Sequence, residues 1–447
     1  MIPDDWRRGE VAVVGLARTG AAASRWLATQ GVSVYASDRA SAGLEDTARA
    51  LGALGVAVEL GRHDLGRIAR ATVVIASPGV PPDAEPLVAA RHAGVAVRSE
   101  IDLAARALRT TRLIVITGTN GKSTVTALIA HLMEQGGMPC PAAGNIGRPL
   151  IALALDSTPP PWASVEVSSF QLHDSPDLRP AVGVLTNLSP DHLDRYPDVA
   201  AYYDDKRLLF GNADAGSVWV LNGDDDAVLA LASGAAGTHS LWRLAGRADA
   251  WLDRTGDVLM LDAAPVLPRG DLPLLGEHNV ANALAAILAT RAAGLPRDAI
   301  RDGLRTFRGL PHRLEIVRTV DGVVWINDSK ATNIASTAVG ARAMDRPFVL
   351  ILGGRHKGEP YTSLASVLEH QCRHVLAYGE AGPLVVADLG RLLPVTRVAT
   401  LEEAVAAARR WAATGDAVLL SPACSSFDLF RNYEERGARF RALVEAL

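Results

Sequence analysis

An apolar strand, a glycine-rich turn and the start of a helix follow one another at residues 113–126, and no other stretch constrains the fold as strongly. It reads LIVITGTNGKSTVT. Leu113–Thr117 has the apolar run of a buried parallel strand, and the apolar residues from Val125 to Met133 fall on one helical face. Backbone N–H groups in such a turn point at phosphate oxygens, and the helix dipole adds positive potential. The stretch therefore predicts a phosphate-binding loop in an α/β sheet.

The side chains of this loop predict chemistry on a nucleoside triphosphate. Lys122 would contact the β- and γ-phosphates, and Ser123 or Thr124 would offer a hydroxyl to magnesium. The usual loop has a glycine five residues before Gly121, where this chain has Ile116, so we expect a shorter loop. An ordinary strand-to-helix turn is the alternative, and the Gly-Lys-Ser-Thr run argues against it.

Length and composition exclude several classes of protein. The chain has 447 residues, enough for two to four domains. A net charge of −4 with interspersed acids and bases argues against nucleic-acid binding, and no apolar run could span a membrane. Cys140, Cys372 and Cys424 show no paired spacing, and the N-terminus lacks a signal sequence. We expect a globular protein of the reducing cytoplasm.

A second strand–turn–helix opening occurs at residues 10–20. Its turn, Gly15–Gly20, resembles a dinucleotide-binding turn whose middle glycine is replaced by Ala17. Asp38, after the next predicted strand, could hold a ribose or a base. NAD binding, binding of another nucleotide and plain α/β packing stay open here, although Ala17 crowds the approach of a pyrophosphate.

Several polar residues end predicted elements of the following region, each with two interpretations. Glu166, at the end of a predicted strand, is a magnesium ligand or a surface acid. His192, between two aspartates, is a metal ligand, a base or part of a solvated turn. Lys206 lies among charged residues of a predicted helix, as on a solvated face. Asn279 and Asn282 share a helix face and either read a purine edge or cap the helix.

A third α/β unit follows residue 310. Its predicted strands, 323–326, 348–352, 375–378 and 417–420, each end in a polar loop. The carboxyl ends of parallel strands share one edge, so these loops should cluster. Arg313, Lys330 and Lys357 fall in them and predict a cationic collar for phosphates and carboxylates. Each alone would be an ordinary surface charge.

Together these motifs resemble the Mur ligase family over nearly the whole chain. The matching stretches are GTNGKST (118–124), NIG (145–147), EVSSFQL (166–172), DHLDRYP (191–197), HNVANA (278–283), PHR (311–313), NDSKATN (327–333), GG (353–354) with Lys357, and SPACSSFDLF (421–430). Within the family the chain resembles the glutamate-adding members. It lacks the DNPR motif of the diamino-acid-adding members and the GTHGKT loop of the alanine-adding ones, and folylpolyglutamate synthases lack a domain like residues 10–100.

The resemblance implies three α/β domains. They would be an N-terminal Rossmann-like domain for the UDP-substrate (1–105), a central phosphate-loop ATP-binding domain with a parallel sheet (106–309) and a C-terminal Rossmann-like domain for the amino acid (310–447). The implied enzyme is an ATP-dependent acid–amino-acid ligase that adds D-glutamate to UDP-N-acetylmuramoyl-L-alanine through an acyl phosphate. That reaction belongs to peptidoglycan precursor synthesis, and hence to cell-wall biogenesis, cell shape and cell division. The resemblance also implies a cytoplasmic monomer. The alternatives are the L-glutamate-adding relative and, outside the family, a nucleotide-dependent dehydrogenase or a nonenzymatic binding module.

The resemblance also assigns site residues. The UDP-sugar-peptide would contact Thr19, Asp38, Ser77, Pro78, Gly79, Asn145, Gln171 and His192. ATP would contact Gly118, Thr119, Asn120, Gly121, Lys122, Ser123, Thr124, Asn282, Arg313 and Asp328. Ser123 and Glu166 would bind one Mg2+, and His192 and a CO2-carbamylated Lys206 a second. Glutamate would contact Lys330, Thr332, Lys357, Ser426 and Tyr433. The catalytic set would be Lys122, Glu166, His192, Lys206 and Lys330.

Overall fold

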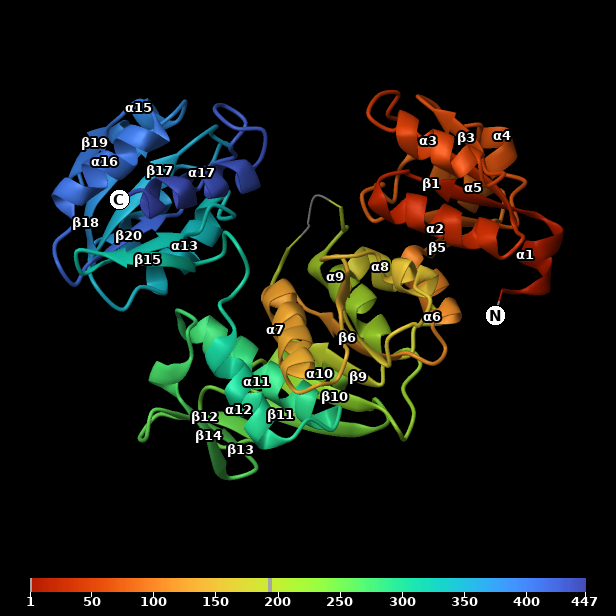
Figure 1. The fold of residues 1–447 in the computed structure, drawn as a ribbon, viewed down its shortest axis with the longest axis horizontal. Helices are drawn as coiled ribbons and strands as arrows, with labels where there is room; N and C mark the ends of the chain where they lie inside the picture. Colours follow the sequence, from red (N-terminus) through yellow and green to blue (C-terminus); the bar gives the residue numbers. More distant parts are fainter. Residues whose placement is uncertain (1, 192–194) are drawn as a thin grey trace. The chain divides into compact units, whose positions relative to one another are not determined.

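The protein is described from a computed structural model that covers residues 2–191 and 195–447 (Figure 1). The chain divides into two compact units. Unit 1 comprises residues 1–271 and 281–305, and unit 2 comprises residues 272–280 and 306–447. Unit 1 carries two β-sheets and unit 2 carries one, so the expected α/β class with three sheets is confirmed. The domain boundaries expected at residues 105 and 309 stay predictions. Across the described ranges, no helix is long and apolar enough to cross a membrane.

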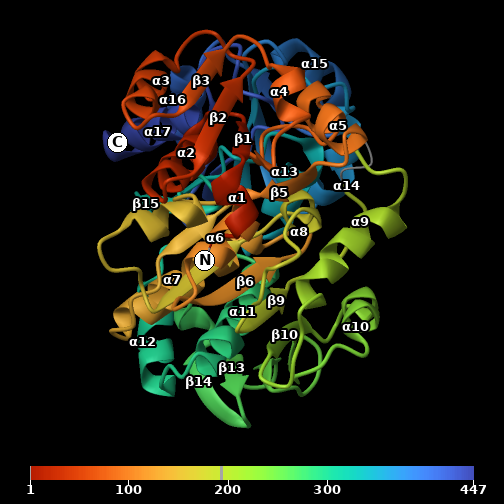
Figure 2. The ribbon, with the colours of Figure 1, turned by 90° about the vertical axis from the view of Figure 1, so that its right-hand side faces the viewer.

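The first sheet is parallel and has the strand order β3-β2-β1-β4-β5. Its strands are β1 (Glu10–Val14), β2 (Ser33–Asp38), β3 (Ala57–Leu60), β4 (Val73–Ala76) and β5 (Ala96–Ser99), and its helices are α1 (Asp4–Arg8), α2 (Arg18–Thr29), α3 (Glu45–Gly52), α4 (Leu65–Ile68), α5 (Glu85–His92) and α6 (Glu100–Ala107). Helix α2 packs against β1 and β2 (Figure 2). The chain proceeds from β1 to β2 and β3 on one side and continues with β4 on the other. The carboxyl ends of β1 and β4 therefore form the topological switch point where such sheets bind ligands.

The second sheet has nine strands in the order β14-β13-β12-β11-β10-β9-β6-β8-β7. The strands are β6 (Arg112–Thr117), β7 (Ala142–Gly144), β8 (Trp162–Glu166), β9 (Val182–Leu185), β10 (Val218–Asn222), β11 (Thr238–Arg243), β12 (Ala250–Asp253), β13 (Val258–Leu261) and β14 (Ala264–Pro268), and the helices are α7 (Lys122–Gln135), α8 (Ser169–His173), α9 (Val199–Arg207), α10 (Asp226–Ala232), α11 (Glu277–Ala292) and α12 (Arg297–Thr306). Strands β12, β13 and β14 pair antiparallel. The expectation of a parallel sheet therefore holds from β7 to β12 only.

The sheet of unit 2 has the order β15-β16-β20-β17-β18-β19. Its strands are β15 (Glu315–Val320), β16 (Val323–Asn327), β17 (Phe348–Gly353), β18 (Cys372–Tyr378), β19 (Val395–Arg397) and β20 (Ala417–Leu420), and its helices include α13 (Ile334–Arg342), α14 (Ala365–Leu368), α15 (Gly382–Leu389), α16 (Leu401–Trp411) and α17 (Tyr433–Glu445). The four strands expected from the sequence are present. Strand β15, an antiparallel edge strand with several exposed residues, was not expected because its apolar pattern is weak.

Helix α6 ties the two sheets of unit 1 together through buried polar groups. Glu100 Oε1 accepts a hydrogen bond from the Ile151 N–H at 2.5 Å, and Asp102 Oδ1 accepts one from the Asp177 N–H at 2.8 Å. Both carboxylates are buried, within an apolar core that includes residues of both sheets. Because buried carboxylates are stable only with donors, these bonds fix α6 against the second sheet.

Glu100→Gln is expected to flatten the dependence of unfolding free energy on pH. Burial raises the pKa of Glu100 from 4.5 to about 7. The folded carboxyl therefore holds its proton more tightly than the unfolded one does. Its contribution to the free energy of unfolding is fully present below pH 4.5 and is lost as the pH rises through about 7, a decrease of at most about 3 kcal/mol. Glutamine keeps an acceptor for the Ile151 N–H without the charge. Urea unfolding at about pH 5.5 and about pH 8 measures this, with exposed Glu134→Gln as control. An unchanged pH slope in Glu100→Gln would contradict it.

Candidate active site

The phosphate loop joins β6 to α7 through two glycines whose backbone conformation and close neighbours disfavour any side chain. Gly118 has φ +140° and Gly121, the residue before α7, has φ +83°. A Cβ on Gly118 would overlap Thr186, and a Cβ on Gly121 would overlap the amide oxygen of Asn282 on α11. The absence of side chains at these two positions lets an anion approach the start of a 14-residue helix, where the helix dipole favours negative charge. The predicted ATP residues Gly118–Thr124 and Asn282 therefore lie together.

A second loop, which follows β9, holds the phosphate loop in place. The Asn120 N–H donates to Asn187 Oδ1 at 2.9 Å, and Thr186 Oγ1 donates to the Asn120 carbonyl at 2.7 Å. Thr119 Oγ1 bonds to the backbone of Ser189. Since each contact uses the loop's own backbone or short side chains, the cradle is organised before any ligand binds.

Two lysines converge on the carbonyl oxygen of Gly118. Lys122 Nζ donates to it at 3.0 Å and to the Thr119 carbonyl at 2.7 Å. Lys206 Nζ, from α9, donates to the same Gly118 oxygen at 2.8 Å. Lys206 is only 1% exposed, so the solvated helix face considered for it is wrong. Burial and the Lys122 cation lower the pKa of Lys206 to about 7, which makes a neutral amine accessible at physiological pH.

Glu166 lies at the carboxyl end of β8, next to β6. Its Oε1 accepts a hydrogen bond from Asn145 Nδ2 at 3.2 Å. Its Oε2 is buried and has no hydrogen-bond partner among the described residues. A buried carboxylate oxygen without a donor suits a hard cation, so Glu166 fits the magnesium role. The described ranges hold no cluster of three His, Cys, Asp or Glu side chains, and His192 lies outside them.

The predicted substrate residues of the first sheet surround its switch point. Asp38 accepts hydrogen bonds from the Leu16 N–H at 2.6 Å and the Ala40 N–H at 2.8 Å. Ser77 Oγ donates to the Gly15 carbonyl at 2.8 Å. These two side chains therefore shape the first turn of the sheet. The remaining predicted residues of this sheet are Thr19, half-buried on α2, and Pro78 and Gly79, which follow β4.

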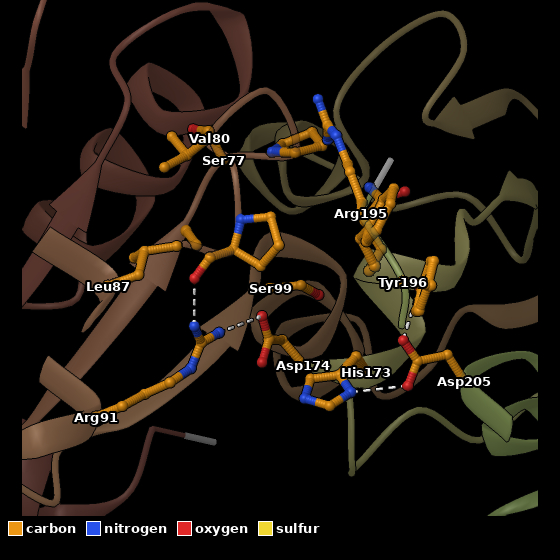
Figure 3. A pocket seen from close by; sticks show the side chains of 15 residues that line it. Ser77, Val80, Leu87, Arg91, Ser99, His173, Asp174, Arg195, Tyr196 and Asp205 are labelled. Atoms are coloured by element: carbon orange, nitrogen blue, oxygen red, sulfur yellow. Dashed lines mark hydrogen bonds and ion pairs between the residues drawn. The ribbon is translucent and has the colours of Figure 1, made fainter. Parts of the chain in front are cut away.

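A cavity of about 340 Å3 lies between the loop after β4 and helices α8 and α9 (Figure 3). It brings together three predicted substrate residues, Ser77, Pro78 and Gln171. Gln171 also closes a capping box with Ser168 at the start of α8, so its side chain has a structural role too. Asn145 and Gly79 are not among its lining residues.

Polar and aromatic side chains that the sequence analysis did not single out complete this cavity. Asp205 accepts hydrogen bonds from His173 Nδ1 at 2.8 Å and from the Tyr196 hydroxyl at 2.7 Å (Figure 3). The Asp205 carboxylate raises the pKa of His173. Phe170 stacks on Tyr196 with ring centroids 5.2 Å apart, and the Arg195 guanidinium lies 5.3 Å from the Phe170 centroid. The cavity thus offers an aromatic platform beside charged groups.

In unit 2, four of the predicted glutamate residues lie in the loops after β16, β17 and β20, and the fifth, Tyr433, begins α17. Lys330 Nζ donates to the Tyr433 hydroxyl at 3.0 Å and lies 4.7 Å from its ring centroid. Lys357 Nζ donates to Thr332 Oγ1 at 3.4 Å. Ser426, in the loop after β20, is buried. The clustering of strand-end loops expected from the sequence is thus present in this unit.

Asp328 is buried deep in unit 2. Its Oδ2 accepts a hydrogen bond from Ser421 Oγ at 2.9 Å and its Oδ1 accepts one from the Leu314 N–H at 3.2 Å. Burial raises its pKa to about 7, and nearby Arg313 opposes that rise. Both oxygens therefore already have protein donors. The contacts of Asp328 and Arg313 with ATP stay predictions.

The chain has only four lysines, and all four are predicted site residues: Lys122, Lys206, Lys330 and Lys357. Lysine and arginine together number 45, so apart from histidine arginine supplies every other basic side chain. Arginine cannot lose its proton or act as a compact point charge, whereas lysine can do both. The four lysines are therefore expected at positions where an amine serves better than a guanidinium. This count is a sequence signal that would have singled out Lys206.

Three family profiles match successive parts of the chain. The N-terminal domain of MurD-like Mur ligases matches residues 9–99, the Mur ligase middle domain residues 116–290 and the Mur ligase glutamate ligase domain residues 312–424. These three ranges contain the switch point, the phosphate loop and most of the strand-end loops of unit 2.

Whole-chain relatives agree with the profiles. The UDP-N-acetylmuramoylalanine–D-glutamate ligase of Salinibacter ruber is 42% identical over 469 aligned positions that cover all of both chains. The enzyme of the same name from Myxococcus xanthus is 42% identical, with 98% of each chain covered. The crystal structure of UDP-N-acetylmuramate-alanine ligase from Thermotoga maritima has a TM-score of 0.61 at 18% identity, with 98% of this chain and 99% of that chain covered. At 18% identity, the similarity to this crystal structure shows a shared fold alone.

Proposed function

The chain belongs to the Mur ligase family, and we propose from this premise that it joins D-glutamate to UDP-N-acetylmuramoyl-L-alanine in an ATP-dependent reaction. The observation that carries the proposal is the phosphate loop with Lys122, Lys206 and Glu166 around it, in a chain that is 42% identical to D-glutamate ligases along its whole length. The role would be in peptidoglycan precursor synthesis.

In the first step the carboxylate of the alanyl substrate attacks the γ-phosphorus of ATP, and ADP leaves an acyl phosphate behind. Negative charge spreads over the phosphoryl oxygens in this step. The Lys122 ammonium, already oriented by two loop carbonyls, stabilises that charge together with the N–H groups at the start of α7. The cavity beside α8 and α9 is proposed to receive the sugar-peptide part, since Phe170 and Tyr196 form a flat apolar platform there.

In the second step the amine of glutamate attacks the acyl carbon, and the tetrahedral intermediate expels phosphate. Lys357 and Thr332 would bind the carboxylates of glutamate through charge-assisted hydrogen bonds. Lys330, held by the Tyr433 hydroxyl, would stabilise the charge on the phosphate that leaves. Ser426 would complete the amino-acid contacts.

Magnesium would be held at two sites, by Ser123 and Glu166 and by His192 and a carbamylated Lys206. The unpartnered Oε2 of Glu166 supports the first site. The depressed pKa of Lys206 supports the carbamate, because only a neutral amine adds to CO2. When bound, magnesium supplies positive charge at the phosphate oxygens. We further propose a cytoplasmic monomer; the free, buried cysteines Cys140, Cys372 and Cys424 suit a reducing compartment.

The test is phosphate release with ATP, magnesium and UDP-N-acetylmuramoyl-L-alanine, in parallel with D-glutamate, L-glutamate or no amino acid. We expect release to depend on D-glutamate. Release with L-glutamate alone would assign the chain to the L-adding relatives. No release with either isomer would contradict the proposal, and binding of NAD in place of ATP would favour a dehydrogenase.

A further inference from the structure

Arg436, on α17 of unit 2, is a fully buried arginine with no carboxylate partner among the described ion pairs. Its side chain is 0% exposed. A guanidinium removed from water destabilises the fold unless its donors are satisfied. The position of Arg436 therefore has to be explained by what its donors bind.

The three hydrogen bonds of its guanidinium go to the loops that follow β16 and β20. Nε donates to Ser329 Oγ at 2.9 Å, and Nη2 donates to the Ser329 carbonyl at 2.7 Å. Nη1 donates to the Cys424 carbonyl at 3.1 Å. Ser329 precedes Lys330, and Cys424 comes two residues before Ser426. One side chain thus joins the two loops that carry these predicted glutamate contacts.

The loop after β17 approaches the same guanidinium. A Cβ on Gly354 would lie 3.2 Å from Nη1 of Arg436 and would overlap the Ser425 carbonyl, so only glycine permits this approach. The Arg355 N–H donates to the Ser425 carbonyl at 2.9 Å, and the Ser425 N–H donates back at 3.1 Å. This exchange couples the loop of Lys357 to the Cys424 loop.

Helix α17 itself is part of the same network. Ser329 Oγ accepts from Arg436 Nε and donates to the Tyr433 carbonyl at 2.8 Å. The Tyr433 hydroxyl in turn accepts from Lys330 Nζ. The Arg436 guanidinium and the Ser329 hydroxyl thus hold the backbone of both residues of the Lys330–Tyr433 contact.

We propose that Arg436 is a positioning residue that sets the affinity of unit 2 for the incoming amino acid. Its rigid planar fork holds the loops of Lys330 and Ser426 together, and the Arg355–Ser425 bonds extend this order to the loop of Lys357. Lysine keeps the charge but has no fork, so it cannot span the same three acceptors. The inference rests on the proposed function, because glutamate is taken as the ligand of this unit.

The experiment compares steady-state constants of Arg436→Lys with those of the wild-type protein. We expect the KM for D-glutamate to rise about tenfold or more, because charge-assisted hydrogen bonds to two loops are lost. The KM for UDP-N-acetylmuramoyl-L-alanine, whose predicted contacts lie in unit 1, should not change. The matched control is Arg439→Met, one turn along α17, whose exposed side chain pairs with Glu402 at 2.7 Å and should not affect the KM for D-glutamate.

An unchanged KM for D-glutamate in Arg436→Lys would overturn the proposal, as would an equal loss toward every substrate. If that variant does not fold, Ser329→Ala decides, because it removes the hydroxyl between Arg436 and Tyr433. We then expect a smaller rise, of about threefold, in the KM for D-glutamate. An unchanged KM in Ser329→Ala would overturn the proposal. A wild-type protein without D-glutamate-dependent phosphate release would instead refute the proposed function.

Discussion

Replacement of Lys122 by alanine is expected to lower kcat at least about a hundredfold while the protein stays folded. The side chain occupies the centre of the phosphate loop, where its amine bonds to the Gly118 and Thr119 carbonyls and faces the helix start. The Gly118 carbonyl keeps a donor in the variant, because Lys206 Nζ also bonds to it. The loss should therefore be one of transition-state charge stabilisation, with little change in stability.

The same substitution should also act on Lys206. The Lys122 cation is one cause of the low pKa of Lys206, so its removal should raise that pKa and leave less neutral amine for CO2. Lys122→Arg tests whether charge alone is sufficient, and we expect it to be nearly as inactive because a planar guanidinium does not replace the compact charge of an ammonium.

Phosphate release, circular dichroism and calorimetric titration with ATP and magnesium check these expectations. Arg109→Ala, an exposed cation shortly before β6, is the control and should retain full activity. A Lys122→Ala protein with more than about a tenth of wild-type activity would contradict the assignment of the phosphate loop.

The phosphate loop could be predicted because its parts are contiguous in the sequence. Strand β6, Gly118, Gly121 and the start of α7 lie within two dozen residues, and each has a local signature. The strand-end loops of unit 2 could be predicted for a related reason, since apolar runs followed by polar loops indicate a parallel sheet.

Other parts of the site depend on contacts between distant segments. The burial of Lys206 results from a contact with Gly118, 88 residues away, although the neighbouring residues are charged. Arg436 lies in a run, YEERGARFR, that is typical of a solvated helix, and its burial follows from bonds to residue 329. The cavity beside α8 combines residues that are far apart in the sequence, from Ala76 to Asp205, and no local pattern indicates that they share one cavity. Local patterns carry no information about such pairings.

Replacement of Lys206 by alanine is the second change expected to abolish turnover, with a loss of about a hundredfold or more in kcat. The physical reason is the proposed carbamate, which would convert a buried amine beside Lys122 into an anion attracted by that cation. Alanine leaves space where the side chain was, so a short carboxylate such as acetate should restore part of the activity. Lys206→Arg fills that space and cannot add CO2, so it should be inactive with or without acetate.

Few side-chain amines compete with Lys206 for CO2 in this test, because the chain has only four lysines. With 13C-labelled bicarbonate, a carbamate carbon signal should appear in the wild-type protein and be absent from Lys206→Arg. Arg207→Ala is the matched control, since its exposed guanidinium pairs with Asp204 at 2.8 Å on the same helix, and it should keep both signal and activity. An active Lys206→Arg protein would contradict the carbamate. Activity of Lys206→Ala that acetate does not raise would contradict a carboxylate at this position, and the buried amine would then act as a cation beside Gly118.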